Sequence, residues 1–571
     1  MEAQNLYKGA HAQMSSLSSV TECRYSKAKG RHVIATSPIP IGALVVRDQP
    51  YALCLFDDCA PHFCDWCAEP VAAELAILCE QCNDTQVVYC SAACRENANE
   101  CYHRYECGKL RQMLRYIANR HRQQVKADSE NNNKNSEGGV RLHNVLLAVR
   151  MLLRTPVDVM INQYTNHLSI NGAADQLINE QTSKDELNQV DSLEHQFRSL
   201  LNLTTDDDVS LADAEREGRP DLCEFLVAQL VEKGLLDQNK DARWPSKWTN
   251  DQKSAMFSHI LLQLMKRLRR NLQGVWELRA PSHSETRKVL ESHKSHKATA
   301  VYATGALLNH GCDPNTHVVY IKGAVMEARA TRNIKKGEEI VHCYGPRVGA
   351  STRLERQRQL KTELHFTCNC NACVHPKYAQ IDSEMTALRC AGCGSTVSLG
   401  PKTDNVKCAK CGDKPTLNTL EEVRKQILID IGTTEQRKET IPLENLLRVL
   451  QKWEQKLHPN NRLLTNLRAQ TVDLLIDRAQ QSTAIPIINR AIRSVCTLYG
   501  PFSLRASAMW ARLARCYETS AASLNNTNKE KDRYRQMLFI ASFIYWVQLV
   551  YYGETYAKDQ YLLLVATNNE K

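Results

Sequence analysis

Seven cysteines and one histidine between residues 64 and 107 constrain the fold more than any other feature of the sequence. They stand as four pairs in series: Cys64 and Cys67, Cys79 and Cys82, Cys90 and Cys94, and His103 and Cys107. Zinc binds four such ligands in a tetrahedron, and a Cys-x-x-Cys pair supplies two of them from one tight turn. The eight ligands therefore predict two zinc sites rather than a set of buried free thiols. Because the segment has few apolar residues, we expect metal binding to supply its folding free energy.

A second cluster, Cys368-x-Cys370-x-x-Cys373, offers only three ligands. A distant cysteine at the fourth position would complete a structural zinc site, whereas a water molecule there would make the site catalytic. The spacing of these three cysteines leaves both alternatives open.

A third cluster has the spacing of a zinc ribbon, because fourteen residues separate two Cys-x-x-Cys pairs. Its expected ligands are Cys390, Cys393, Cys408 and Cys411. Gly394 and Gly412 directly follow the two pairs and allow the tight turns that such ligand loops need. We therefore predict one zinc ion at this site.

The role of the other cysteines depends on the redox state of the compartment, and the chain has 23 cysteines among 571 residues. The N-terminus lacks the charged region and apolar run of a signal peptide, so we expect a reducing compartment, where disulfides are rare. If Cys312 is a ligand, eight thiols remain, and we assign them to core packing: Cys23, Cys54, Cys59, Cys101, Cys223, Cys343, Cys496 and Cys516.

Composition excludes a chain that is disordered throughout and a coiled-coil filament, because 43% of residues are apolar and 24% are charged. The net charge of +10 is compatible with an acidic partner without requiring one. The longest apolar run, residues 537–552, contains Gln548 and is shorter than a membrane span, so we predict a buried core helix.

Hydrophobic patterns predict strands within residues 31–56 and again within residues 300–345. Residues 143–154 form a helical pattern, residues 124–140 are polar and should form a loop, and residues 155–300 mix helical patterns with charged loops. After residue 415 apolar stripes, the first of them Leu443, Leu446, Leu447, Leu450, Trp453 and Leu457, predict helices. Similar segments recur at steps of roughly 40 to 50 residues, which favours stacked helix pairs of the tetratricopeptide type.

Residues 309–315, Asn-His-Gly-Cys-Asp-Pro-Asn, predict a tight polar turn between two strands. Such a turn either lies on the surface as a simple Asx turn or presents side-chain amides and backbone carbonyls to a ligand. The composition of the turn is compatible with both alternatives.

This turn closely resembles the Asn-His-x-Cys-x-Pro-Asn signature of SET-domain lysine methyltransferases. Residues 27–32 resemble the cofactor loop of that family, residues 337–344 the strand that ends in its active-site tyrosine, and residues 366–373 its post-SET zinc motif. The family pattern implies that Cys312 is the fourth ligand of the second cluster. The eight-ligand cluster has the spacing of a MYND finger. Together the motifs resemble the SMYD (SET and MYND domain-containing) family, and the ribbon is similar to that of its arthropod-type branch.

The resemblance implies an α+β fold: a β-rich SET domain split by a MYND finger, with a post-SET zinc site, a zinc ribbon and a C-terminal α-helical domain similar to tetratricopeptide repeats. The implied boundaries are residues 1–59 for the first part of the SET domain, 60–107 for the MYND finger, 108–270 for a helical insert, 271–365 for the SET catalytic core, 366–374 for the post-SET motif, 375–415 for the ribbon and 416–571 for the helical domain.

The resemblance also implies a protein-lysine N-methyltransferase that uses S-adenosyl-L-methionine and holds about four zinc ions. Tyr344 would be catalytic and Leu364 would line the channel for the substrate lysine. The residues implied to contact the cofactor are Lys29, Gly30, Arg31, Asn309, His310, Phe366 and, with poorer agreement of the flanking residues, Asn271.

Four positions depart from the family pattern. Ala28 and His32 stand where glycines are usual, Gly311 replaces a common serine, and Leu364 replaces an aromatic residue. Cβ atoms at the first two positions would narrow the cofactor loop or forbid a positive φ there.

Three functions are compatible with these features. The first is a methyltransferase for lysines of histone or non-histone proteins that acts in transcriptional regulation, in the nucleus and the cytoplasm. The second is a catalytically weak scaffold whose MYND finger binds proline-rich partner proteins. The third is nucleic-acid binding through the fingers and the basic helix end at residues 266–270, which otherwise is a solvated face with its leucines turned inward. We expect no membrane association and no nucleic acid as the primary ligand.

Overall fold

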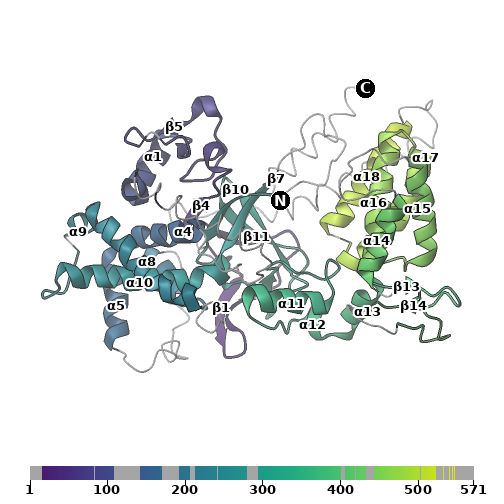
Figure 1. The fold of residues 1–571 in the computed structure, drawn as a ribbon, viewed down its shortest axis with the longest axis horizontal. Helices are drawn as coiled ribbons and strands as arrows, with labels where there is room; N and C mark the ends of the chain where they lie inside the picture. The colour runs from purple at the N-terminus through teal and green to yellow at the C-terminus, as the bar shows by residue number, and fades with distance from the viewer. Residues whose placement is uncertain are drawn as a thin grey trace.

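The structure is a computed structural model that describes most of the chain. The described residues are 16–82, 84–108, 142–169, 192–205, 213–240, 242–278, 294–399, 406–417, 419–431, 443–501 and 503–521, with the separate positions 113, 532, 536, 539, 540, 543 and 546. Figure 1 shows strands in the middle, a small finger with a bundle of helices on one side, and a second group of helices on the other. The predicted loop at 124–140 and nearly all of the predicted helix at 537–552 lie outside the described residues.

A four-stranded sheet brings together motifs that are about 300 residues apart in the chain. Its order is β1 (Thr21–Ser26), β2 (Gly30–Ala35), β12 (Glu339–His342) and β9 (Asn309–His310). Strands β1 and β2 form an antiparallel hairpin, and β12 runs parallel to β9 with Val341 opposite Asn309. The predicted cofactor loop at residues 27–32 (the glycine loop), the polar turn at 309–315 and the strand before Tyr344 therefore meet at one sheet.

Two three-stranded sheets complete the central region. One has the order β10 (Thr316–Ile321), β11 (Val325–Ala330) and β3 (Leu44–Asp48), and the other β4 (Ala52–Leu55), β8 (Lys294–Val301) and β7 (Gln273–Leu278). Alternating apolar residues from these strands, such as Val45, Met326 and Ala328, form one buried core. The strands predicted within residues 31–56 and 300–345 are confirmed. In contrast, β7 and most of β8 fall where helices and loops were predicted.

The finger between β4 and the helical insert is built from short elements. They are the 3-10 turns η2 (Ala60–His62) and η3 (Ala73–Leu75), strands β5 (Ile77–Leu78) and β6 (Val88–Tyr89), helix α1 (Ala92–Ala98), the π turn η4 (Asn99–His103) and α2 (Arg104–Glu106). A small cluster that includes Val88, Tyr89 and Tyr102 is its apolar core. Such a small core is consistent with a finger that depends on metal.

The helical insert packs against the finger and against β4. Its helices are α4 (Leu142–Arg154), α5 (Val157–Ser169), α7 (Leu193–Leu201), α8 (Asp213–Glu232), α9 (Leu235–Gln238) and α10 (Asn250–Asn271). The helix predicted at 143–154 is confirmed as α4. Leu264 and Leu268 of α10 are buried, so the leucines of its basic end do turn inward.

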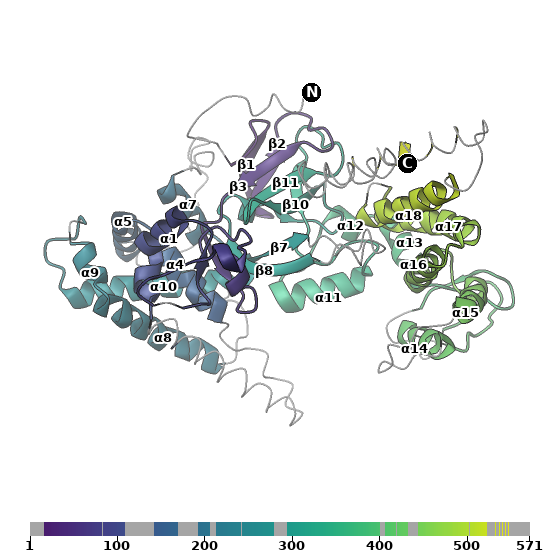
Figure 2. The ribbon, with the colours of Figure 1, turned by 90° about the horizontal axis from the view of Figure 1, so that it is seen from above.

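The remaining elements are the short turn before the polar turn at 309–315 and the helices and strands that follow β12. A 3-10 turn η6 (Gly305–Leu307) precedes the polar turn, and α11 (Arg353–Leu364), α12 (Asn371–Val374) and α13 (Pro376–Glu384) follow β12. The ribbon strands β13 (Leu388–Arg389) and β14 (Thr396–Val397) lead to α14 (Leu420–Ile431), α15 (Leu443–Lys456), α16 (Arg462–Asp477), α17 (Gln481–Tyr499) and α18 (Leu504–Ala521). Figure 2 shows these last five helices gathered away from the central strands.

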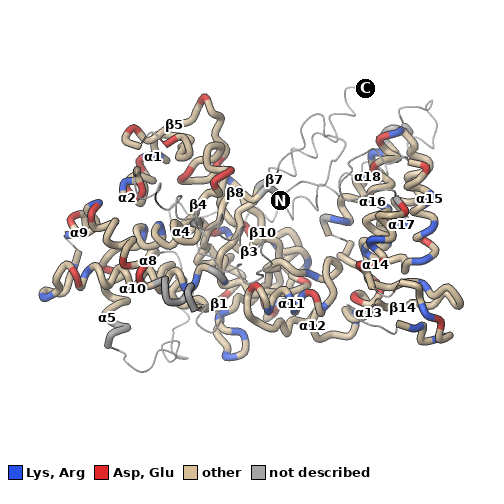
Figure 3. The backbone as a smooth tube through the Cα atoms, in the orientation of Figure 1, with Lys and Arg blue, Asp and Glu red and all other residues tan. Residues whose placement is uncertain are grey.

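The apolar stripe predicted on α15 is confirmed, because Leu446, Leu450 and Trp453 are buried against the neighbouring helices. Leu388 and Val397 of the ribbon lie in the same core, so the ribbon and the helices pack as one body. None of the described helices is long and apolar enough to cross a membrane. Basic and acidic residues are interspersed over all three regions of the described chain (Figure 3).

Candidate active site and zinc sites

The sixteen predicted metal ligands converge into four groups of four, and within each group the ligand atoms lie within 4.8 Å of one another. In the finger, one group is Cys64, Cys67, Cys90 and Cys94, and the other is Cys79, Cys82, His103 and Cys107. The first pair in the chain therefore joins the third, and the second joins the fourth. Sequence spacing left this interleaved pairing open, because pairs of consecutive ligands fit the same spacing.

The chemistry of the donors fits zinc in all four groups. Every ligand is a thiol or an imidazole, and soft ligands of this kind select zinc over calcium or magnesium. Four sulfurs placed about 2.3 Å from one ion are about 3.8 Å apart in a tetrahedron. The sulfurs of Cys312 and Cys373 are 3.6 Å apart, and those of Cys393 and Cys408 are 3.5 Å apart.

The fourth ligand of the second cluster is a distant cysteine, Cys312, which lies with Cys368, Cys370 and Cys373. Its side chain is fully buried, and its backbone N–H points at the sulfur of Cys370 at 3.4 Å. The arrangement is that of a closed structural site with four protein ligands, and it leaves no position for a catalytic water.

The glycines of the ribbon behave as predicted. Gly394 and Gly412 have φ values of +70° and +77°, which favour glycine. Each donates its N–H to the carbonyl of the first cysteine of its pair, Cys390 at 2.8 Å and Cys408 at 2.9 Å. These two turns hold the paired thiols in place.

The polar turn at 309–315 is not a simple surface turn, because its central residues are buried. Asn315 is fully buried; its side chain accepts a hydrogen bond from the N–H of Val341 at 2.9 Å and donates to the carbonyl of Glu339 at 2.8 Å. Gly311 donates its N–H to the carbonyl of His342 at 2.8 Å. The turn is therefore fastened along β12, next to Tyr344.

His310 connects the turn to Tyr344. Its Nδ1 accepts a hydrogen bond from the backbone N–H of Tyr344 at 3.0 Å, and its Nε2 lies 3.3 Å from the sulfur of Cys312. Burial lowers the pKa of His310 to about 4, so the ring is neutral near pH 7. A neutral ring that accepts at Nδ1 carries its proton on Nε2, where it faces the sulfur.

Three aromatic rings lie near the ring of Tyr344, whose side chain remains partly exposed. The ring of His342 is 4.9 Å away, that of His310 is 5.3 Å away and that of Phe366 is 6.4 Å away, measured between ring centroids. The Tyr344 hydroxyl donates to the carbonyl of Leu308 at 2.9 Å, and burial raises its pKa above the ordinary value. The hydroxyl therefore stays protonated and fixed in orientation.

The predicted cofactor loop lies beside Asn309. The amide of Asn309 donates to the carbonyl of Lys29 at 3.2 Å and to the carboxylate of Glu339 at 3.0 Å, and Lys29 pairs with Glu339 at 2.7 Å. Gly30 has a φ of +64°, and a Cβ built on it would meet no atom within 4 Å. The backbone there is open to a ligand, as the donor loop of a cofactor site needs.

Two predicted cofactor residues lie apart from this group. Arg31 turns toward the helical insert, where it donates to the side-chain and backbone oxygens of Ser199 at 2.9 and 2.8 Å. Asn271 donates to the carbonyl oxygens of Thr204 at 3.1 Å and Arg267 at 2.7 Å. Asn271 lines a cavity that Tyr344 also lines.

That cavity has a volume of about 420 Å³, and Tyr344 and Leu364 both line it. It lies between the end of α10, strand β7 and the loop after β12. None of the predicted cofactor residues other than Asn271 lines it. Tyr344 and Leu364, which was predicted to line the lysine channel, therefore share this cavity, and the ring of Tyr344 also contacts the predicted cofactor residues His310 and Phe366.

Sequence reasoning missed His342 as a residue of the site. It lines the cavity and contacts the ring of Tyr344, and burial lowers its pKa to about 3. The alternation of a strand would not have found it, because β12 ends at His342 and Tyr344 lies beyond its end.

A family model described as SET domain matches residues 30–345, which is more than half of the chain. The chain belongs to the SET domain family. The interleaved finger inside the SET domain and the similarity to SMYD relatives make it an SMYD protein.

Three relatives illustrate this similarity. Protein-lysine N-methyltransferase SMYD4 of mouse is 23% identical over 548 residues, 87% of this chain and 64% of the relative. A SET and MYND domain-containing protein of Dictyostelium discoideum is 34% identical over 110 residues, 19% of this chain and 8% of the relative. Human N-lysine methyltransferase SMYD2 is 24% identical over 230 residues, 39% of this chain and 46% of the relative. The chain spans less than two thirds of the length of each.

The departures from the SMYD pattern do not strain this fold. Neither Ala28 nor His32 has a positive φ, and His32 places its Nδ1 3.0 Å from the carbonyl of Gly30. Gly311 is required by packing, because a Cβ there would lie 2.7 Å from the side chain of Val341. Leu364 ends α11 and keeps the cavity wall apolar.

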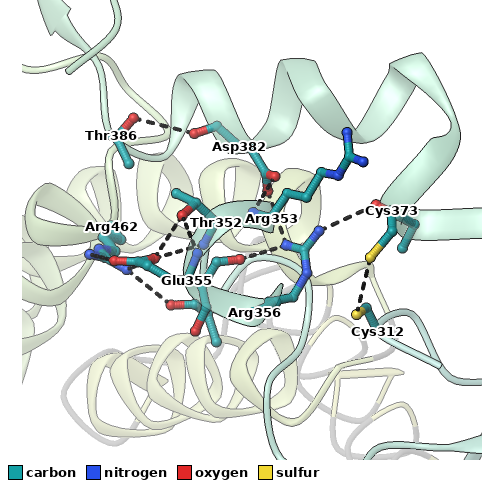
Figure 4. A network of polar contacts seen from close by, with 12 residues as sticks. Cys312, Thr352, Arg353, Glu355, Arg356, Cys373, Asp382, Thr386 and Arg462 are labelled. Atoms are coloured by element: carbon teal, nitrogen blue, oxygen red, sulfur yellow. Dashed lines mark hydrogen bonds and ion pairs between the residues drawn. The ribbon is translucent and has the colours of Figure 1, made fainter. Parts of the chain in front are cut away.

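A buried arginine ties the post-SET zinc site of this SMYD protein to its C-terminal helices (Figure 4). Arg356 is fully buried and donates to the carbonyl of Ala372 beside Cys373 at 3.2 Å, and to Asp382 of α13 at 3.1 Å. Glu355, the residue before Arg356 on α11, pairs with Arg462 of α16 at 2.9 Å. The helices and the zinc site that carries Cys312 are thus held by the same helix, α11.

Proposed function

We propose that this chain is a protein-lysine N-methyltransferase that transfers a methyl group from S-adenosyl-L-methionine to the ε-amine of a lysine. The observation that carries the proposal is the position of Tyr344. Its ring contacts His310 and Phe366, two of the predicted cofactor residues, and it also lines the cavity that contains Leu364. The mouse and human relatives, which are named as lysine methyltransferases, also favour this activity.

The proposed chemistry assigns each group one task. Bound S-adenosyl-L-methionine supplies a methyl group on a cationic sulfur. Lys29, Gly30 and Asn309 offer backbone and amide groups for binding, and Phe366 excludes water. Tyr344 orients the lysine amine with an oxygen that is fixed by its bond to Leu308. Alignment of this kind lowers the barrier because the reacting groups meet in one geometry.

The lysine has to arrive without its proton, because only the neutral amine is a nucleophile. A carboxylate beside the amine would stabilise the protonated form and raise its pKa. Within the part of the chain that the structure describes, no aspartate or glutamate lines the cavity. Leu364 and Trp276 add an apolar wall, and desolvation by such a wall lowers the pKa of a lysine.

Replacement of Tyr344 with phenylalanine tests the proposal. We expect methyl transfer to fall by roughly 100-fold or more, because a positioned catalytic hydroxyl contributes about that much. We expect the affinity for S-adenosyl-L-methionine, measured by titration calorimetry, to stay the same. The matched control is Tyr25→Phe on the exposed hairpin strand β1, which should keep full activity.

The outcomes of this test are distinct. If the wild-type chain shows no heat and no thermal shift with millimolar cofactor, the methyltransferase proposal is wrong and a scaffold remains. If Tyr344→Phe transfers methyl groups at the wild-type rate, the role given to Tyr344 is wrong.

We also propose that the chain carries four zinc ions, two in the finger and one each in the post-SET site and the ribbon. Elemental analysis of the purified chain should find four per molecule and three in either Cys90→Ser or Cys82→Ser, because these two cysteines belong to different groups. Cys101→Ser is the matched control, since Cys101 lies in the finger but in neither group. A loss of both finger ions in each variant would argue against two separate sites.

The finer predictions of the resemblance remain proposals: histone or non-histone lysines as substrates, a role in transcriptional regulation, proline-rich partners of the finger, and a location in nucleus and cytoplasm. A comparison of methyl-lysine across the proteome with and without the chain would identify the substrates. If no substrate is found in the nucleus, or none in the cytoplasm, that compartment would be removed from the proposal.

A further inference from the structure

Among the described residues, the cavity beside Tyr344 is lined by basic side chains and by no acidic one. Two arginines and three histidines line it: Arg270, Arg347, His296, His317 and His342. They come from the end of α10, from strands β8, β10 and β12, and from the loop after β12. Figures 1 and 2 both place the end of α10 next to the sheet that contains β7 and β8. Elements far apart in the chain thus give this wall one sign of charge.

Neither arginine is paired with a carboxylate in the described part of the chain. The Nε of Arg270 is buried and has no hydrogen-bond partner among the described residues. Arg267, one turn earlier on α10, differs, because it donates to the carbonyl of Leu201 at 2.7 Å and to Gln263. A buried donor without a partner costs free energy, which an acceptor from a ligand would recover.

The charge of the wall comes from the arginines rather than from the buried histidine. The pKa of His342 is lowered by burial to about 3, so this ring is neutral near pH 7. Guanidinium groups stay charged and bind carboxylates through two parallel hydrogen bonds. A wall with two such groups and no acid attracts carboxylates and repels cations.

We propose that this cavity selects lysines flanked by acidic side chains, which Arg270 and Arg347 bind. The inference rests on the proposed methyltransferase function of the site and specifies its substrate class. The basic end of α10 thus faces an anion at Arg270, in addition to turning its leucines inward.

The carboxylate of the cofactor is the competing anion for Arg270. The positions of the other cofactor residues argue against it, because Lys29, Gly30, Asn309, His310 and Phe366 do not line the cavity. Both arginines line the same cavity as Leu364, which was predicted to line the lysine channel.

The test uses the full chain and three fluorescent peptides with one central lysine, flanked by glutamates, by glutamines or by lysines. Anisotropy measures binding in the presence of S-adenosyl-L-methionine, and a transfer assay is run on the same peptides. We expect the glutamate-flanked peptide to bind about tenfold tighter than the lysine-flanked one, the size of one charge-assisted hydrogen bond. Salt should weaken this preference.

The variants Arg270→Gln and Arg347→Gln should each remove much of the preference, and Arg347→Glu should invert it. Arg358→Gln is the matched control, because Arg358 is exposed on α11, the helix that carries Leu364, and does not line the cavity. It should bind all three peptides as the wild type does. If the Arg270 variant fails to fold, the Arg347 variants test the proposal, because Arg347 is only half-buried.

Two results would overturn the inference. One is a wild-type chain that binds the lysine-flanked or glutamine-flanked peptide as tightly as the glutamate-flanked one. The other is loss of cofactor affinity in Arg270→Gln with an unchanged peptide preference, which would assign Arg270 to the cofactor. The function is tested separately: a chain that prefers acidic flanks but transfers no methyl group would overturn the proposed activity and leave the inference standing.

Discussion

Replacement of Cys312 with serine should remove one zinc ion and nearly all methyl transfer. The sulfur of Cys312 belongs to the post-SET group, and the ring of His310 lies 3.3 Å from it. Loss of this ligand would free the turn that holds Asn309 and His310 against β12. Because even residues outside the first ligand shell change metal affinity or activity by 10–100-fold, we expect a loss of roughly 100-fold or more here.

Three measurements check this prediction: zinc content, cofactor affinity by titration calorimetry, and the rate of transfer. All three should fall together in Cys312→Ser. Cys496→Ser is the control, since Cys496 is a half-buried thiol of α17 outside the four groups and should change none of them. A Cys312→Ser chain that loses its zinc but still binds the cofactor with wild-type affinity would show that the turn does not depend on the metal.

Replacement of Arg150 with methionine should destabilise the junction of the finger, the helical insert and the central strands. Arg150 of α4 is fully buried and forms ion pairs with Asp65 and Glu106 of the finger, both at 2.8 Å and both fully buried. It also donates to the carbonyl of Leu53 in β4 at 2.9 Å, and its guanidinium carbon is 3.9 Å from the ring centroid of Tyr102. Removal of one partner from such a network leaves two buried carboxylates without their cation.

We expect the free energy of unfolding of this part of the chain to fall by about 3–5 kcal/mol, the usual cost of breaking a buried ion pair. Urea unfolding followed by tryptophan fluorescence and by zinc release would measure the change. The control is Arg154→Met, one turn later on α4. Arg154 is only partly buried, and it donates one long hydrogen bond to the carbonyl of Pro50 at 3.2 Å.

A triple variant sharpens the test of Arg150. Arg150→Met combined with Asp65→Asn and Glu106→Gln removes the stranded charges, so it should recover part of the lost stability. If the triple variant is no more stable than Arg150→Met, the loss came from packing rather than from uncompensated charge.

These contacts show why the finger is not an independent module. Gly323, in the turn between β10 and β11, approaches the finger so closely that a Cβ there would lie 2.0 Å from the carbonyl of Cys67. Together with Arg150, this close approach joins the first zinc group to the strands that position the active site. Loss of zinc from the finger is therefore transmitted to the central sheets through packing, because dense interiors transmit strain.

Much of the site could be predicted because its chemistry depends on residues that are close in the chain. A Cys-x-x-Cys pair, a polar turn of seven residues and an apolar stripe on α15 are each recognisable within one or two turns of backbone. The resemblance to SET proteins then joined Cys312 to the three post-SET cysteines, 56 positions away from the first of them. The structure bears out that grouping.

Tertiary structure alone decided the relations between distant segments. It paired Cys64 and Cys67 with Cys90 and Cys94, it placed Asn271 at the cavity rather than with the glycine loop, and it turned Arg31 toward Ser199 of the helical insert. It also formed β7 and β8 from a segment whose pattern predicted helices and loops, since pairing with β4 outweighed local preference. The physical reason is common to all four: local chemistry determines which residues can act as ligands or form strands, whereas chain packing determines which of them meet.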